Sequence, residues 1–60
     1  MFIELTRMSN KPEFVNVNDI VILSDSNQGG STIKYRNFRD FILYQEPYED
    51  VVVMIREGLK

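Results

Sequence analysis

The spacing of the hydrophobic residues changes once along this chain, and that change limits the folds open to it. Up to about residue 45, apolar residues alternate with polar ones or gather in short β-branched runs, as they do in strands. From residue 48 onward they recur at the interval of a helix. We therefore expect an α+β fold: a small antiparallel β-sheet of about four strands with one C-terminal α-helix packed on it.

Turn-forming residues divide the first part of the chain into strands. The expected strands cover residues 2–8, 14–23, 31–36 and 41–45. Asparagine and aspartate at positions 16–19 predict a kink inside the second strand, because their side chains bond nearby backbone groups. Residues 24–30 are expected to form a flexible polar loop, and residues 37–40 a hairpin turn.

The helix is expected to run from about Pro47 to Glu57 and to stop at Gly58. Its predicted apolar face consists of Tyr48, Val51, Val52, Ile55 and Leu59. Three consecutive valines have poor helix propensity, so this helix depends on packing against the sheet. The acidic residues at its start fit the positive end of the helix dipole better than they fit a cation site.

The length of the chain limits how stable it can be. We read residues 1–60 as a single domain, with neither repeat nor linker. A core of this size contributes no more than about 3–5 kcal/mol, and without cysteine or histidine the chain has no disulfide, thiolate or imidazole site to add to it. The predicted core comprises Ile3, Leu5, Val15, Ile20, Ile22, Ile33, Tyr35, Val51, Val52 and Ile55. The alternation leaves open which face of residues 41–45 is buried, because nearly all of them are apolar.

The composition argues against several functions. The usual general base, histidine, is absent, and neither lysine lies in a recognisable nucleophile motif, so no catalytic site, metal or cofactor is expected. Gly29 and Gly30 precede a strand rather than a helix, unlike the glycines of a phosphate-binding loop. No run of apolar residues is long enough to cross a membrane, and the start of the chain is unlike a signal peptide, so we expect a cytoplasmic protein.

One segment combines cations with aromatic rings and is the candidate for binding nucleic acid. Its candidate residues are Lys34, Tyr35, Arg36 and Arg39. Such residues can stack on bases and contact phosphates, but the same pattern describes a hairpin tip with solvated charges. Seven basic against nine acidic residues give a net charge of −2, which opposes binding to a polyanion, so nucleic acid is not the expected partner.

Apolar residues in excess of what one short helix can cover point to a protein partner. The candidate partner surface is Phe2, Met8, Phe38, Phe41, Tyr44 and Met54. Uncovered apolar side chains and open sheet edges on a marginally stable domain favour association. We expect self-association, as a dimer or higher oligomer, or binding to another protein.

Several short motifs resemble those of the small flagellar and swarming motility protein family (FlbD-like). They are Ile3-Glu4-Leu5-Thr6-Arg7, Phe14-Val15-Asn16, Ser31-Thr32-Ile33 and Glu49-Asp50-Val51, followed by Ile55, in the same order as in the family. The chain departs from the family pattern in the loop of residues 24–30, in the turn of residues 37–40, and at Pro47, where the family has serine. The resemblance implies a motility-associated role through protein contacts, and it brings no active-site residues with it.

A second resemblance supplies an alternative. Leu5-Thr6-Arg7 is similar to the start of the carbon-storage-regulator family of RNA-binding proteins, which have about this length and end in a helix. The basic residue that family carries just ahead of its helix is absent here, where Gln45-Glu46-Pro47 stands instead. A small RNA-binding regulator is therefore the alternative to a protein-interaction module.

Overall fold

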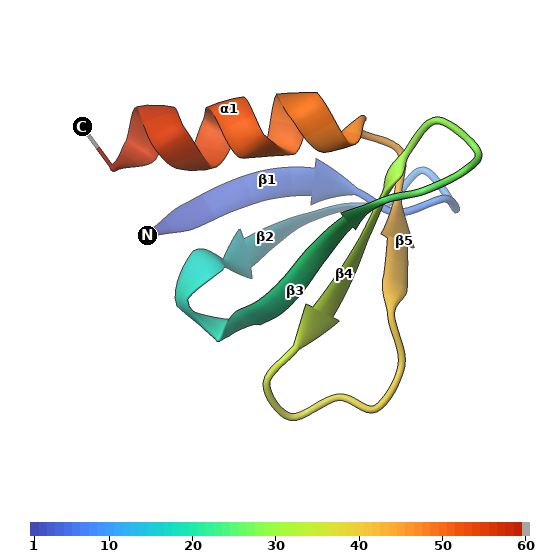
Figure 1. Cartoon of the computed structure of the whole chain (residues 1–60), viewed down its shortest axis with the longest axis horizontal. Coiled ribbons are helices and arrows are strands. Elements are labelled where there is room, and N and C mark those ends of the chain that lie inside the picture. The colour runs from blue at the N-terminus through green and yellow to red at the C-terminus, as the bar shows by residue number, and fades with distance from the viewer. Residues whose placement is uncertain (60) are drawn as a thin grey trace.

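The structure is a computed structural model and describes residues 1–59. It is an α+β fold with five antiparallel strands in two small sheets and one C-terminal helix (Figure 1). The elements are β1 (Phe2–Thr6), β2 (Pro12–Asn16), a 3-10 turn (Val17–Asp19), β3 (Ile20–Asp25), β4 (Ser31–Tyr35), β5 (Ile42–Tyr44) and α1 (Tyr48–Gly58). The expected class is confirmed, but the strands form two sheets where one was expected, because the kink at residues 16–19 separates β2 from β3.

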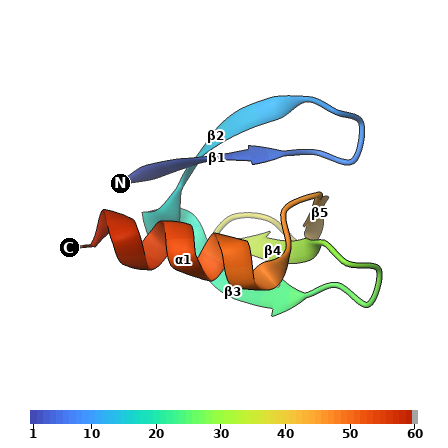
Figure 2. The ribbon, with the colours of Figure 1, turned by 90° about the horizontal axis from the view of Figure 1, so that it is seen from above.

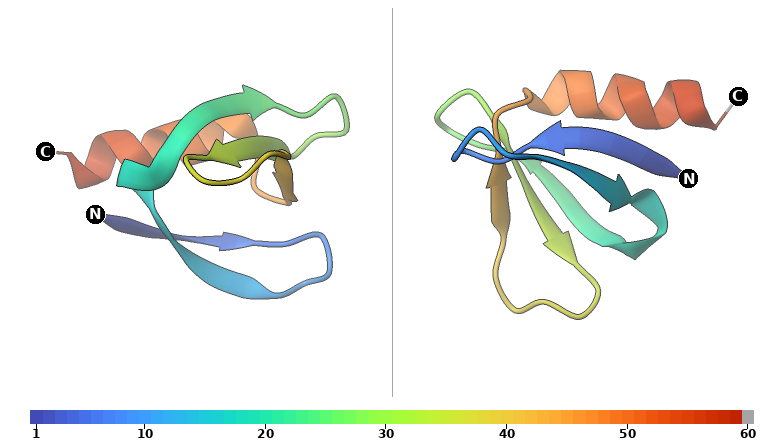
Figure 3. Two further views of the ribbon diagram at one scale, coloured as in Figure 1. Left: turned by 90° about the horizontal axis from the view of Figure 1, so that it is seen from below. Right: turned by 180° about the vertical axis from the view of Figure 1, so that it is seen from behind.

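The two sheets form two layers. One contains β1 and β2, and the other has the strand order β3-β4-β5. Viewed from above and from below, the β1–β2 hairpin lies apart from the second sheet (Figures 2 and 3). The helix runs along one side of the molecule and contacts β3 and β4 (Figure 1). Apolar side chains fill the space between the layers.

The kink predicted at residues 16–19 is a 3-10 turn. The side-chain Oδ1 of Asn16 accepts a hydrogen bond from the Asn18 backbone N–H at 3.1 Å and caps the turn. The turn ends at Ile20, where β3 begins. A short polar side chain in the right place thus redirects the chain from one layer to the other.

A bulge in β3 overturns one predicted core position. Ile20 pairs with Tyr35, but the next pair is Ile22 with Lys34, so the register shifts between Ile20 and Ile22. An extra residue reverses the alternation of faces that follows it. Leu23 therefore packs against the core, while Ile22 is 41% exposed, and its prediction as a core residue is wrong.

The helix begins one residue later than expected and ends near the predicted stop. Pro47 is extended (φ −60°, ψ 152°) and caps the helix, with Glu49 and Asp50 in the first turn and Arg56 in the last. These charges match the helix dipole at both ends. Val51 is buried completely.

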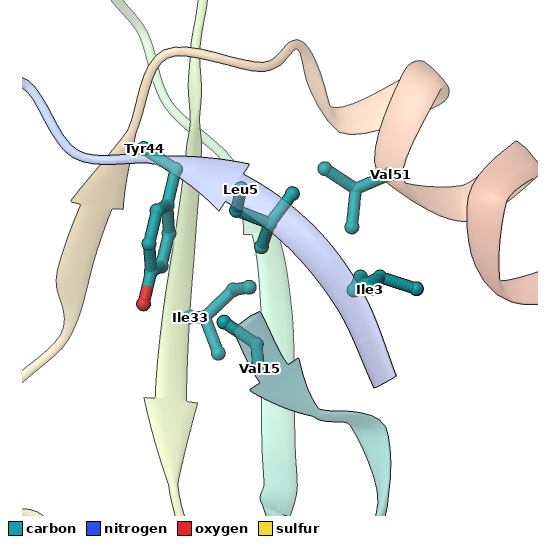
Figure 4. Close-up of a cluster of buried hydrophobic side chains, with 6 residues drawn as sticks. All are labelled: Ile3, Leu5, Val15, Ile33, Tyr44 and Val51. Carbon is teal, nitrogen blue, oxygen red and sulfur yellow. The ribbon is translucent and has the colours of Figure 1, made fainter. Parts of the chain in front are cut away.

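The buried core lies between the two sheets and the helix (Figure 4). It comprises Ile3, Leu5, Val15, Ile33, Tyr44 and Val51. Five of these were predicted, and Ile20, Tyr35 and Ile55 pack against the cluster as partly buried residues. Val52 is only half-buried and lies outside the cluster. Tyr44 settles the open question about residues 41–45, because it turns inward from β5 with an exposure of 1%.

The layers are joined where β1 and β5 end. Arg7 and Tyr44 form an isolated antiparallel bridge, and the Gln45 N–H donates to the Thr6 carbonyl at 2.8 Å. The Thr6 N–H donates to Oε1 of Glu46, also at 2.8 Å. These bonds fix the start of the chain against the residues that precede the helix.

Candidate functional site: a groove beside strand β2

An open groove of about 310 Å³ lies between β2 and the far end of β4. Phe14, Val15 and Asn16 line it on the β2 side. Its other residues are Arg7, Glu13, Asp19, Tyr35, Arg36, Asn37, Phe38 and Ile42. The groove exists because the second sheet and its β4–β5 loop continue past the β1–β2 hairpin (Figure 3). It is the part of the molecule where an exposed strand edge, aromatic rings and charged groups come together.

Four polar side chains form a connected network at this groove. Nε of Arg7 donates to Oε1 of Glu13 at 3.0 Å, and the Tyr44 hydroxyl donates to the same oxygen at 2.7 Å. The Tyr35 and Tyr44 hydroxyls lie 2.6 Å apart and share a hydrogen bond. The guanidinium carbon of Arg7 is 5.9 Å from the centre of the Tyr44 ring, within the range of a cation–π contact.

The protonation states of this network follow from its contacts. The hydrogen bond from Tyr44 lowers the pKa of Glu13, burial opposes that effect, and Arg7 adds to the lowering. Burial raises the pKa of Tyr44 and that of Tyr35, so both phenols keep their protons at neutral pH. The network therefore holds one carboxylate and one guanidinium in fixed charge states, and it links both sheets at the base of the groove.

Aromatic rings form the exposed rim of the groove. Phe14 is 73% exposed and Phe38 is 56% exposed. The Phe38 ring packs edge-to-face against Tyr35, with ring centres 6.0 Å apart and an angle of 68° between the ring planes. Phe14 belongs to neither predicted set of residues. Alternation from its buried neighbour Val15 was the signal that would have placed it outside.

The structure separates the residues of the candidate partner surface. Phe2, Met8, Phe38 and Phe41 are exposed as expected. Met8 and Phe41 meet in a second hollow of about 350 Å³, together with Leu43, whereas Phe38 lines the groove. Tyr44 is buried in the core and Met54 packs against it, so their assignment to an exposed surface is wrong. Both turn inward because β5 and α1 place them beside Val51 and the β1–β2 layer.

The candidate nucleic-acid residues do not share one surface. Lys34 pairs with the exposed Ile22 on the outer face of its sheet, while the neighbouring Tyr35 turns inward and bonds Tyr44. Arg36 donates from Nη2 to the Asn18 carbonyl at 2.8 Å, and its Nε lies 3.9 Å from Asp19. Arg39 lies apart from them, exposed in the loop between β4 and β5.

Within residues 1–59, the structure holds no cluster of three or more histidine, cysteine, aspartate or glutamate side chains suited to a metal ion. No helix in that part of the chain has the length and apolar character needed to cross a membrane. Comparison of the chain with protein-family models, with curated proteins and with solved structures found no match. The geometry of the groove and its surroundings is therefore the basis for assigning a function.

Proposed function

We propose that this chain is a non-catalytic module that binds another protein, and that the groove beside β2 is its principal contact region. The observation that carries this proposal is the pair of exposed phenylalanines, Phe14 and Phe38, at the rim of an open groove. Large apolar side chains gathered at a surface hollow are typical of interaction sites, and aromatic residues are enriched at the centre of interfaces.

The expected energy of this contact favours a reversible complex. Covering an exposed phenylalanine side chain contributes about 1.5–3 kcal/mol. Two such residues contribute about 3–6 kcal/mol, and the cost of association is about 4–15 kcal/mol, so over most of that range backbone and polar contacts must supply the rest. Truncating either ring should therefore weaken a complex by about tenfold or more, because each 1.4 kcal/mol is a factor of ten in affinity.

Comparative capture from the native host tests this proposal. Tagged wild-type protein is compared with the variants Phe14→Ser and Phe38→Ser. Val53→Ser is the matched control, because Val53 is an exposed apolar residue too (53%) but lies on the helix. A partner that binds the groove is lost from both groove variants and kept by the control. A partner kept by both groove variants would show that the groove is not the contact region. Light scattering on the purified chain tests the expected self-association separately.

The resemblance to the FlbD-like family makes motility the process in which we propose that this module acts. Deleting the gene from a flagellated host should then reduce swimming or swarming, and complementation with Phe38→Ser should fail to restore it. A deletion strain with normal motility would contradict this part of the proposal. Fractionation of the same cells tests the cytoplasmic location that the sequence favours.

RNA binding is less well supported by the positions of the basic residues. Tyr35 and Arg36 already form hydrogen bonds with other parts of the chain, and Lys34 lies on the face of β4 opposite to Tyr35. Gel-shift titration with RNA provides the test. Binding that falls steeply with added salt would favour the regulator alternative, because phosphate contacts release counterions.

A further inference from the structure

Among residues 1–59, strand β2 has one hydrogen-bonded neighbour, β1, and its other edge is open to the groove. At one end of the hairpin the Arg7 N–H donates to the Lys11 carbonyl at 2.8 Å, and at the other the Val17 N–H donates to the Met1 carbonyl at 3.0 Å. Backbone groups alternate in direction along a strand, so the odd-numbered residues of β2 bond β1. The N–H and C=O groups of Phe14 and the N–H of Asn16 therefore point toward the groove, whereas the Asn16 C=O belongs to the 3-10 turn that Asn16 caps.

We infer that the groove binds an extended segment of the partner protein as an additional strand, paired with the open edge of β2. This inference rests on the proposed function and specifies its mode of binding. An open strand edge is a template for pairing, and strand addition is a common way for a domain to bind a peptide. The groove lies directly beside this edge, and Tyr35 and Phe38 from the second layer line it.

The alternation of a strand determines which side chains the added segment needs. The residue of the added segment that lies opposite Phe14 exchanges two backbone hydrogen bonds with it. Its side chain points outward, as the Phe14 side chain does. The residues on either side of it point into the groove, toward Tyr35 and Phe38. These two inward positions therefore favour β-branched or other apolar side chains.

For an antiparallel segment, the charges beside the two ends of β2 determine which end residues are favoured. Lys11 precedes the strand and Asp19 follows it, and both are exposed. An antiparallel segment of seven residues centred on Phe14 ends opposite Lys11 and begins opposite Val17, two residues before Asp19. A basic residue at its start and an acidic residue at its end therefore complement the charges beside the two ends of β2.

A second copy of this chain does not fit the same edge. If two copies paired their β2 strands about Phe14, both Phe14 side chains would lie on one face of the joined sheet. Both Val15 side chains, which are buried in their own copies, would lie on its other face. Each copy has its own β3–β4–β5 layer against that buried face, and this layer continues past the edge of β2 (Figure 3). The two layers would have to occupy one volume, so the occupant is a single strand.

Nuclear magnetic resonance titration with a defined peptide tests this inference. The probe is the acetylated and amidated peptide Lys-Thr-Val-Thr-Val-Thr-Glu, in which the central threonine is to lie opposite Phe14. We expect saturable binding and slower hydrogen exchange of the Phe14 and Asn16 amides, and an unchanged amide signal from Val53 on the helix. The peptide with lysine and glutamate exchanged should bind several-fold more weakly, and the peptide with proline at its centre about tenfold more weakly.

Variants of the protein separate backbone pairing from side-chain contact. Phe14→Pro lacks the ring and the central N–H and should weaken peptide binding well beyond the roughly tenfold expected of Phe14→Ala, which lacks the ring but keeps that N–H. Should Phe14→Pro fail to fold, the exchange rates of the wild-type amides give the same answer.

Three outcomes would overturn the inference. The first is an absence of binding at millimolar peptide, and the second is binding that leaves the Phe14 and Asn16 amides unprotected. The third is protection of these amides that appears without peptide and rises with protein concentration, which would identify a second copy as the occupant. In each case, capture of a host partner that is sensitive to Phe38→Ser would still support the proposed function.

Discussion

Replacing Tyr44 by phenylalanine removes one oxygen atom from the network that joins the two sheets. The ring is 1% exposed and keeps its volume, so the substitution leaves no cavity in the core. It deletes the 2.7 Å hydrogen bond to Glu13 and the 2.6 Å hydrogen bond shared with Tyr35. The change in the free energy of unfolding therefore reports the contribution of this network.

The structure sets the size of the expected effect. A hydrogen bond to a charged group contributes about 1.5–3 kcal/mol, and one between neutral groups about 0.5–1.5 kcal/mol. The Glu13 side chain is 37% exposed, so solvent screens its bond to Tyr44 and the lower end of the first range applies. We expect Tyr44→Phe to destabilise the chain by about 2 kcal/mol, a large share of the roughly 3–5 kcal/mol available to a core of this size.

Urea denaturation followed by far-ultraviolet circular dichroism measures this loss. With a slope of about 1 kcal/mol/M, the unfolding midpoint should fall by about 2 M at pH 7, with the slope unchanged. Tyr48→Phe is the matched control, because the Tyr48 hydroxyl has no hydrogen-bond partner among residues 1–59. Its midpoint should stay close to that of the wild type.

The same pair of proteins has a defined dependence on pH. The pKa of Glu13 is lowered in the folded state, so its carboxylate adds stability above its unfolded pKa of about 4.3 and loses that contribution as the pH falls through the folded value. Tyr44 is the largest cause of the lowering. The stability difference between wild type and Tyr44→Phe should therefore be full at pH 7 and shrink below about pH 4. A midpoint within about 0.5 M of the wild type, or a difference that grows in acid, would refute the reasoning.

Three further substitutions probe the packing around this network. Leu5→Ala should cost about 2–5 kcal/mol and leave the chain largely unfolded at 25 °C, because Leu5 is completely buried; a cooperative thermal transition close to that of the wild type would contradict this. Gly30→Ala places a Cβ against the Tyr44 carbonyl oxygen and should destabilise the protein by about 1–3 kcal/mol. The effect should exceed that of Gly29→Ala, where the only strain comes from the φ of 95°; equal melting temperatures of the two variants would show that the strand carrying Tyr44 moves to make room. Ser31→Ala should match or exceed the wild-type stability in urea titration, because the buried Ser31 hydroxyl has no partner within the described chain; a loss above about 1 kcal/mol would show that it has one.

Local signals predicted most of the fold. The alternation of Ile3 and Leu5 identified the inward face of β1, and the polar residues at positions 16–19 identified the turn between the layers. The spacing of Val51 and Ile55 identified the helix face that packs on the core. Ile22 was assigned to the core because a bulge gives no clear signal in a sequence of consecutive apolar residues. The bulge reverses which face the following residues occupy.

The candidate site was less accessible to sequence reasoning, because its contacts join distant parts of the chain. Glu13 lies 31 residues from Tyr44, and neither residue type indicates the other. Tyr44 was assigned to the surface because residues 41–45 are almost uniformly apolar and their burial is decided by the pairing of β5 with β4. Phe38 could be recognised as exposed, whereas the groove beneath it depends on how far the second layer extends past β2.

The packing of β1 against residues that are synthesised much later affects how the chain folds during its synthesis in the cell. Leu5 is synthesised early, but Tyr44 and Val51, which cover it, are synthesised late. A two-stranded hairpin is only marginally stable in water, so β1 and β2 leave the ribosome without a finished core. About 35 residues separate the end of β2 from Val51 and take about 2–7 s to add at the usual rate of translation, so the lifetime of the uncovered hairpin depends on elongation rather than on folding.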